Sequence, residues 1–268
     1  MFFENNFCKD ADGLAPVVGT ILMVGIVVVL AAVIGTQALS VDTPDDHYER
    51  FKEITDQNIN SETLPDGLVA RWSFEGNYED VTGNGNDGSA VGGVVFADGV
   101  SGQAIRLDGS SYVEVPSSES LNITDEITLV AYVKWTIDPA EGAGYANIVC
   151  KGGTSDNARS YRLQHRPSDN DEFEFSVQFP SGNEWIHTSS GPQTGEWYQV
   201  VGVYNGTNMI LYVNGENKDE ESQSGSIMIY NTPLCIGSAD GSRQFEGCID
   251  EVQIYNRALS QAEIQSIG

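Results

Sequence analysis

The feature that most constrains this chain of 268 residues is a long uncharged segment near its start. From Leu14 to Val41 there is no Asp, Glu, Lys or Arg, and Val, Ile, Leu and Ala predominate. As an α-helix this segment would reach roughly 42 Å, which exceeds the hydrocarbon core of a bilayer, about 30 Å. A helix of a soluble core would keep a polar stripe, and this segment has none. We therefore predict a transmembrane or filament-packed helix over residues 14–41.

The residues in front of this helix indicate how the chain is processed. A polar leader, residues 1–13, meets the apolar run at Asp12-Gly13-Leu14-Ala15. The apolar run is too long for a secretory signal that is cleaved off. The junction and the run LAPVVGTILMVGIVVVLAAVIG resemble the class III signal peptide and N-terminal domain of archaeal type IV pilins. This resemblance implies a prepilin peptidase that cuts between Gly13 and Leu14, pilin subunits as partners, and a retained helix that anchors the protein in the cell membrane or in a pilus.

Charge narrows the range of partners further. The chain has 39 acidic and 13 basic side chains, a formal net charge of −26. This field repels nucleic acid and anionic lipid surfaces, so we expect no nucleic-acid partner. An acidic surface is also typical of proteins adapted to high salt, which favours a halophilic archaeon over an ordinary acidic secreted protein. Residues 42–66 are predicted to form an acidic linker with a short helical stretch.

The remainder of the chain, residues 67–268, has the pattern of an all-β domain. Short runs rich in Val, Ile, Tyr and Phe alternate with Gly, Asn and Asp, as strands alternate with turns. Within Glu172–Phe179, alternate positions are apolar, which predicts one buried face. Asn214-Gly215 is a typical type I′ hairpin turn.

The end of the chain carries a helix signal. Ser260 and Glu263 have the spacing of a capping box, so we predict a short helix that begins after Ser260.

Five runs of this domain occur in a specific order: GLVARWSFEGNYEDVTGNGNDGSAVGG, SGQAIRLDGSSYVEVP, ITLVAYVKW, GEWYQVVGVYNGTNMILYVNGE and FEGCIDEVQIYNRALSQAEI. They resemble the laminin-G-like, concanavalin A-like jelly rolls. The resemblance implies an antiparallel jelly-roll β-sandwich with Trp72, Trp135 and Trp197 in its core.

Glucanases share this fold, so a catalytic role is one alternative. Retaining enzymes need two carboxylates about 5 to 5.5 Å apart, presented by an ExDxxE strand that this chain lacks. Asp250 and Glu251 come nearest, but as neighbours on a strand they are expected to point to opposite faces. The three histidines suggest no Ser-His-Asp arrangement. We predict no catalytic residues and no enzyme, and a glycan-active enzyme remains the less favoured alternative.

A glycine-rich loop, residues 79–88, offers oxygen ligands of the kind that calcium prefers. The jelly-roll resemblance implies a structural Ca²⁺ where this loop meets the C-terminal strand, with Asp80, Asn84, Asn86 and Asp250 as ligand candidates. The alternative is that the Asn and Gly residues only form consecutive turns.

Carbohydrate recognition is the usual role of such domains and requires an exposed aromatic with polar neighbours. Tyr161, His165, Trp185 and His187 are the candidate ligand-binding residues. The alternative interpretation is a partly buried sheet face.

Cysteines and sequons complete the candidate sites. Cys235 and Cys248 lie in successive strand-like runs and are a candidate disulfide, the alternative being two buried free thiols. Asn122-Ile-Thr and Asn205-Gly-Thr are candidate glycosylation sites. Together with the pilin resemblance, they indicate an extracellular C-terminal domain.

We therefore expect a pilin-like cell-surface protein whose jelly-roll domain binds extracellular glycan or protein in adhesion. A structural envelope protein without a soluble ligand is the alternative.

Overall fold

The computed structural model describes residues 64–138, 144–153, 159–168 and 171–267, and Leu64–Gly268 forms one compact unit. The predicted leader and apolar helix, and nearly all of the linker, lie outside the described residues. The cleavage site at Gly13 and Leu14 therefore stays a prediction. Within the described ranges, no helix is long and apolar enough to cross a membrane.

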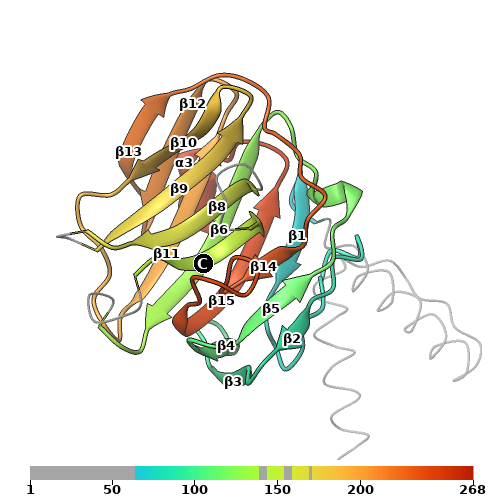
Figure 1. Cartoon of the computed structure of the whole chain (residues 1–268), viewed down its shortest axis with the longest axis vertical. Coiled ribbons are helices and arrows are strands. Elements are labelled where there is room, and N and C mark those ends of the chain that lie inside the picture. Colours follow the sequence, from blue (N-terminus) through green and yellow to red (C-terminus); the bar gives the residue numbers. More distant parts are fainter. Residues whose placement is uncertain (1–63, 139–143, 154–158, 169–170, 268) are drawn as a thin grey trace, which may run out of the picture. The chain divides into compact units, whose positions relative to one another are not determined.

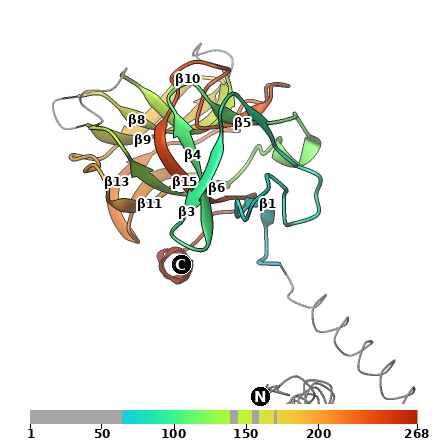
Figure 2. The same cartoon turned by 90° about the horizontal axis from the view of Figure 1, so that it is seen from below.

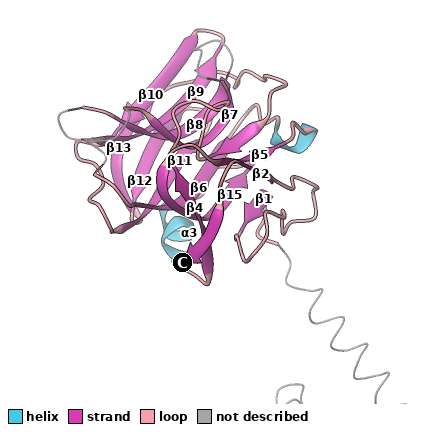
Figure 3. Cartoon of the chain, turned by 60° about the horizontal axis from the view of Figure 1, so that its bottom comes forward, coloured by secondary structure: helices cyan, strands magenta, loops and turns pink. Residues whose placement is uncertain are grey.

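Two antiparallel sheets stack face to face and form the predicted jelly-roll β-sandwich (Figures 1 and 3). One sheet has eight strands in the order β13-β12-β11-β6-β15-β4-β3, and β1 pairs with β15. Its strands are β1 (Leu68–Trp72), β3 (Val95–Asp98), β4 (Gln103–Asp108), β6 (Ile127–Trp135), β11 (Trp197–Tyr204), β12 (Asn208–Val213), β13 (Glu216–Ser222) and β15 (Glu246–Tyr255).

The second sheet has seven strands in the order β10-β9-β8-β7-β14-β5-β2. Its strands are β2 (Ser89–Val91), β5 (Tyr112–Val115), β7 (Ala146–Gly152), β8 (Arg159–Arg166), β9 (Glu172–Phe179), β10 (Gly182–His187) and β14 (Leu234–Ile236). A 3-10 helix, η1 (Glu119–Leu121), and a short α-helix, α3 (Gln261–Ser266), complete the described part.

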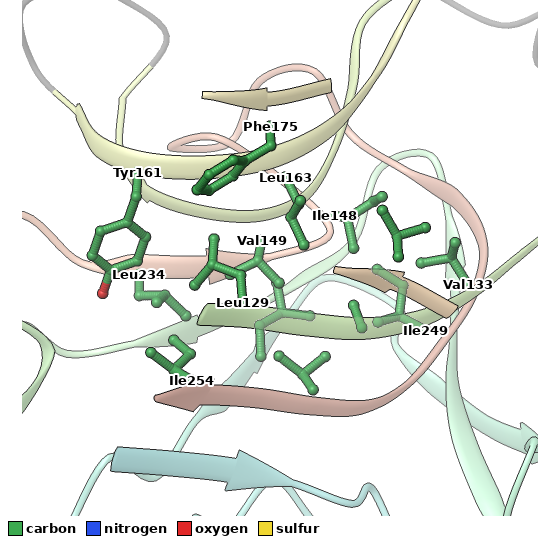
Figure 4. Close-up of a cluster of buried hydrophobic side chains, with 14 of the residues drawn as sticks. Leu129, Val133, Ile148, Val149, Tyr161, Leu163, Phe175, Leu234, Ile249 and Ile254 are labelled. Atoms are coloured by element: carbon green, nitrogen blue, oxygen red, sulfur yellow. The ribbon is translucent and has the colours of Figure 1, made fainter. Parts of the chain in front are cut away.

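The core lies between the sheets, where alternate residues of each strand point inward. Figure 4 shows Leu163 and Phe175 of the seven-stranded sheet above Leu129, Ile249 and Ile254 of the eight-stranded sheet, all fully buried. Each such side chain stabilises the fold by about 1.5–3 kcal/mol. The predicted alternation in β9 is confirmed, because its apolar residues belong to this core.

Of the three tryptophans predicted in the core, Trp72 and Trp135 are buried there. The prediction for Trp197 is wrong. It lies opposite Lys134 in the pairing of β11 with β6, and the Lys134 ammonium is 4.7 Å from its ring centre. Because Val133 and Trp135 point into the core, Lys134 and Trp197 point to the outer face of the eight-stranded sheet.

The predicted local signals at the hairpin and the helix are also confirmed. Asn214 and Gly215 have φ of 52° and 74°, as a type I′ turn requires. The Ser260 hydroxyl accepts from the Glu263 amide, and the Glu263 carboxylate accepts from the Ser260 amide. The capped helix α3, next to the label C in Figure 2, packs Ile264 against the outer face of the eight-stranded sheet.

Four strands, β2, β3, β10 and β13, form the edges of the two sheets. Edge strands are flanked by solvent and need no buried face, so their sequences lack the apolar alternation that identifies a strand. β13, with the sequence ENKDEES, has no buried residue.

Candidate functional site

The outer face of the seven-stranded sheet is lined with polar side chains, and we call it the polar face. Strand pairing places five residues in one row across it. Cys235 pairs with Cys150, Cys150 with Arg162, Arg162 with Ser176, and Ser176 with Trp185. Directly paired residues of antiparallel strands point to the same side of the sheet. Their chain neighbours, such as Leu163 and Phe175, point into the core, so the row faces outward.

Parallel rows extend this face on both sides. Gln164 pairs with Glu174, and Glu174 with His187. On the other side of the central row, Gln178 pairs with Asn183. Polar residues thus occupy the positions of β8 and β9 that alternate with the core residues.

An ion pair lies buried at the centre of the polar face. Arg162 Nη2 is 2.9 Å from Glu174 Oε1, and the two side chains are only 4% and 6% exposed. Gln164 Nε2 donates to the same oxygen at 2.6 Å. Burial lowers the pKa of Arg162, the neighbouring Arg159 lowers it further, and Glu174 opposes both effects.

The hydrogen bonding of this centre is incomplete within the chain. All but one of the buried side-chain polar atoms that lack a partner in the described part of the chain lie on the polar face. They are Arg162 Nε and Nη1, Gln164 Oε1, Ser176 Oγ, Gln178 Oε1 and Asn147 Oδ1. A buried polar atom without a partner costs about 1–3 kcal/mol. Such atoms are normally satisfied by ordered water or a ligand, so their clustering makes the polar face the candidate site.

An aromatic platform stands beside these groups. Trp185 on β10 is 49% exposed, the largest exposed side chain among the described hydrophobic residues. His187 lies two residues further on the same side of β10, with Nδ1 3.2 Å from Glu172 Oε2. These two members of the predicted ligand-binding set lie on one face.

The other two members of that set point the opposite way. The Tyr161 hydroxyl donates to the Leu121 carbonyl at 2.9 Å, and the ring belongs to the core. The His165 ring packs edge-on against Trp135, and its Nε2 is 3.2 Å from Asp171 Oδ1. The prediction of one patch of four residues is therefore wrong, because it ignored the alternation of β8.

The residues it missed are Arg162, Gln164, Glu174 and Ser176. Their alternation with the apolar residues of β8 and β9 is visible in the sequence and would have identified them.

Two further arginines flank the polar face. Arg243, in the loop between β14 and β15, lies 4.7 Å from the ring centre of Tyr145, and its carbonyl accepts from the Asn147 amide at 2.8 Å. At the other end, Arg159 Nε donates to Asn183 Oδ1 at 3.2 Å.

The predicted Cys235–Cys248 disulfide is wrong. Cys235 lies on β14 of the seven-stranded sheet and Cys248 on β15 of the eight-stranded sheet, because the chain crosses between the sheets after β14. Both are free and buried, as is Cys150. Burial raises the pKa of Cys150 to about 11 and that of Cys235 to about 12, so these thiols are protonated at neutral pH.

The predicted calcium ligands are engaged within the protein. Asp80 accepts hydrogen bonds from the amides of Arg71, Thr82 and Asn86, and from two side chains. Asn84 and Asn86 donate to the Val69 carbonyl. The described residues hold no cluster of three or more His, Cys, Asp or Glu side chains that could bind a metal.

The fourth predicted ligand, Asp250, accepts from the amides of Val100, Ser101 and Glu251. Both carboxylates of the set thus already accept hydrogen bonds from the chain, and calcium binding stays a prediction.

Asp250 and Glu251 share one side of their sheet, contrary to the sequence expectation. Glu251 has a φ of 45°, and the pairing of β15 with β6 shifts register between Asp250 and Gln253. This β-bulge turns Glu251 outward, where it binds Arg71 at 2.9 Å.

The two sequons occupy turns. Asn122 caps η1. Asn205 lies in the β11–β12 turn, where its Oδ1 accepts from the Thr207 hydroxyl at 2.9 Å. Glycosylation of either stays a prediction.

The signature of the concanavalin A-like lectin/glucanases superfamily matches residues 107–265, more than half of the chain. The chain belongs to this superfamily. The signature of the archaeal type IV pilin N-terminus matches residues 12–47. Both resemblances seen in the sequence are thus confirmed. The pilin segment identifies a membrane-anchored or pilus surface protein that carries a lectin-like domain. No curated protein matches the chain.

Solved structures share the jelly-roll fold. Domain 4 of AbnA, a GH43 extracellular arabinanase from Geobacillus stearothermophilus solved with arabinotriose, is 21% identical with a TM-score of 0.58, over 74% of this chain and 97% of that one. The binding domain of Paraclostridial Mosquitocidal Protein 1 is 22% identical with a TM-score of 0.62, over 75% and 52%.

Botulinum neurotoxin type C, whose cell entry depends on two ganglioside molecules, is 15% identical with a TM-score of 0.59, over 75% and 50%. This chain thus spans about half the length of the toxin chains. At these identities the likenesses show the shared jelly-roll fold.

Proposed function

We propose that this lectin-like pilin-type protein is an adhesin that binds an extracellular glycan on its polar face. One observation carries the proposal: half-exposed Trp185 shares a row with buried polar groups whose hydrogen bonds are incomplete. A buried polar network without an exposed aromatic would indicate only bound water, and an aromatic alone would indicate only an edge strand.

The chemistry of the face suits a sugar. The apolar C–H face of a pyranose ring stacks on an indole, and its hydroxyl groups both donate and accept hydrogen bonds. Arg162 supplies unpaired donors, and Gln164 and Gln178 supply unpaired acceptors. Binding would complete hydrogen bonds that the chain leaves open, which offsets the cost of their burial.

The pilin segment would multiply such a site. In this proposal a prepilin peptidase removes residues 1–13, and the helix anchors the domain outside the cell or packs among pilin subunits. An array of weak sites along a filament gains avidity without any new contact. An N-terminus at Leu14 in mass spectrometry supports this processing, and an intact leader would contradict it.

The glycan proposal is tested by applying the full-length protein, in a detergent without a sugar headgroup, to a glycan array. We expect binding to a defined set of glycans, weakened about tenfold or more by Trp185→Ala. Trp197→Ala is the matched control, because Trp197 lies on the outer face of the other sheet.

Two outcomes would contradict the proposal. An array without hits would favour a protein ligand or a structural envelope role. Equal loss in both tryptophan variants would show that the polar face is not the site.

A further inference from the structure

Two cysteines lie directly opposite each other where β7 and β14 meet. Cys150 of β7 pairs with Cys235 of β14 in the register of these antiparallel strands. Their chain neighbours Val149 and Leu234 point into the core. Successive side chains of a strand alternate between its two faces, so both thiols lie on the polar face, on the same side of the sheet.

The backbone hydrogen bonds on either side of the two cysteines fix how far apart they are. The Gly237 amide donates to the Ile148 carbonyl at 2.8 Å. The Gly152 amide donates to the Pro233 carbonyl at 3.2 Å. Hydrogen-bonded pairs recur at every second position of an antiparallel ladder, so the two cysteines between these bonds form such a pair. Their Cα atoms are then about 5.5 Å apart, inside the range of roughly 4.4–6.8 Å that disulfides bridge.

A bond between the two sulfur atoms requires only a small rearrangement. The Cys150 thiol donates to the Gly152 carbonyl at 3.3 Å, and a thiol is a weak donor. Directly paired Cβ atoms lie about 4.5–5.5 Å apart, against about 3.5–4.5 Å in a disulfide. The two strands therefore need to approach by about 1 Å, and β14 has only 3 residues to move.

The third described cysteine lies on the other side of the molecule. Cys248 of β15 pairs with Arg106 and Lys134, while its neighbour Ile249 points into the core. Cys248 therefore lies on the outer face of the eight-stranded sheet, and the core of the sandwich separates it from the polar face. Among the described cysteines, the pair on β7 and β14 is thus the one within bonding reach.

The position of this pair matters because β14 joins two parts of the seven-stranded sheet. It pairs with β7 on one side and with β5 on the other. Its 3 residues alone therefore connect β5 and β2 to the strands β7 to β10 within this sheet. A covalent bond between β14 and β7 would hold the polar face in one piece.

We propose that Cys150 and Cys235 form a disulfide that fastens β14 to β7. The bond forms by thiol–disulfide exchange with a small-molecule disulfide. One cysteine thiolate attacks this disulfide and releases one small thiol, and the other thiolate attacks the mixed disulfide and releases the second. The two cysteines lose two electrons and two protons, which the small disulfide takes up as it becomes two thiols. Both side chains are buried in the folded domain, so the exchange takes place while the chain folds.

Peptide mass spectrometry tests the bond in the full-length protein. The protein is isolated from its own cells without reductant and unfolded in N-ethylmaleimide, which blocks every free thiol. We expect a linked peptide pair that contains Cys150 and Cys235, and N-ethylmaleimide on Cys248. N-ethylmaleimide on all three of these cysteines, or a link that includes Cys248, overturns the inference.

Reduction then measures what the bond contributes. Dithiothreitol should lower the melting temperature of the wild type by about 5–15 °C, because the disulfide closes a long loop and restricts the unfolded chain. Cys150→Ser with Cys235→Ser should melt no higher than the reduced wild type and should not respond to dithiothreitol. Cys248→Ser is the matched control and should keep the full response.

Two results of the melting experiment would contradict the bond. They are a response to dithiothreitol that persists in the double variant, and a response that disappears in Cys248→Ser. The peptide map uses the wild type alone, so it decides the question even if a serine variant does not fold.

Discussion

The two outer faces of the sandwich differ in what covers them and in how their polar groups are paired. On the eight-stranded sheet, α3 covers an apolar cluster that includes Val130, Val201 and Ile264. Gln199 Nε2 also donates to the carbonyls of Ile264 and Ile267, which fixes the end of the chain. The polar face of the seven-stranded sheet instead buries an ion pair and several unpaired polar atoms. The chain completes the hydrogen bonds of one face, and it leaves several buried polar atoms of the other face without a partner.

This difference implies that the two faces contribute to different properties of the protein. Apolar burial under α3 contributes to stability, since it removes hydrocarbon from water. Buried charges with open hydrogen bonds contribute little to stability, and in the proposed function they serve to bind the glycan. Substitutions on the two faces should therefore affect different measurements.

The largest expected effect is on the face under α3. Ile264→Ala should lower the free energy of unfolding by about 2–5 kcal/mol, because it opens a cavity where Ile264 is fully buried. Urea unfolding measures this, with Ile229→Ala as control, since Ile229 is 45% exposed. A similar loss of unfolding free energy in both variants would contradict a special contribution of the face under α3 to stability.

On the polar face, removal of the buried ion pair is not expected to lower the free energy of unfolding. Arg162→Met combined with Glu174→Leu should leave the protein as stable or raise its free energy of unfolding by about 1–4 kcal/mol, because no charge remains to be desolvated. Glycan binding should be lost at the same time. A marked destabilisation would show that the ion pair is structural.

A smaller effect on stability is expected from the pH dependence of Asp250. Its carboxylate accepts hydrogen bonds from three backbone amides. Burial raises the pKa of Asp250 to about 6, above the 3.8 of an ordinary aspartate. The unfolded chain therefore loses this proton first, and stability falls as pH rises from about 4 to 6, by at most about 3 kcal/mol. Melting curves of Asp250→Asn should lack this fall. An unchanged pH profile would contradict the assignment.

The smallest effect is expected from chelation. Because Asp80 already accepts five hydrogen bonds from the protein, calorimetry with and without EDTA should give the same melting temperature. A lower temperature with EDTA would show that the loop rearranges around the calcium ion predicted from the sequence.

Local chemistry in the sequence was sufficient for much of this protein. The apolar run after Gly13 marks the pilin segment, alternation marks the central strands, and Asn214-Gly215 and Ser260 mark a turn and a cap. These features depend on residues one to four apart, so the sequence displays them directly.

Only the tertiary structure decided how distant segments meet. Cys235 and Cys248 are close in sequence but belong to different sheets, and the bulge at Glu251 reverses the side expected of its carboxylate. The polar face itself arises from the register of five strands, which brings Arg162 beside Cys150 and Trp185 into the same row. Sheet membership and register are long-range pairings, so spacing along the chain determines neither, whereas it does determine turns, caps and the buried face of each central strand.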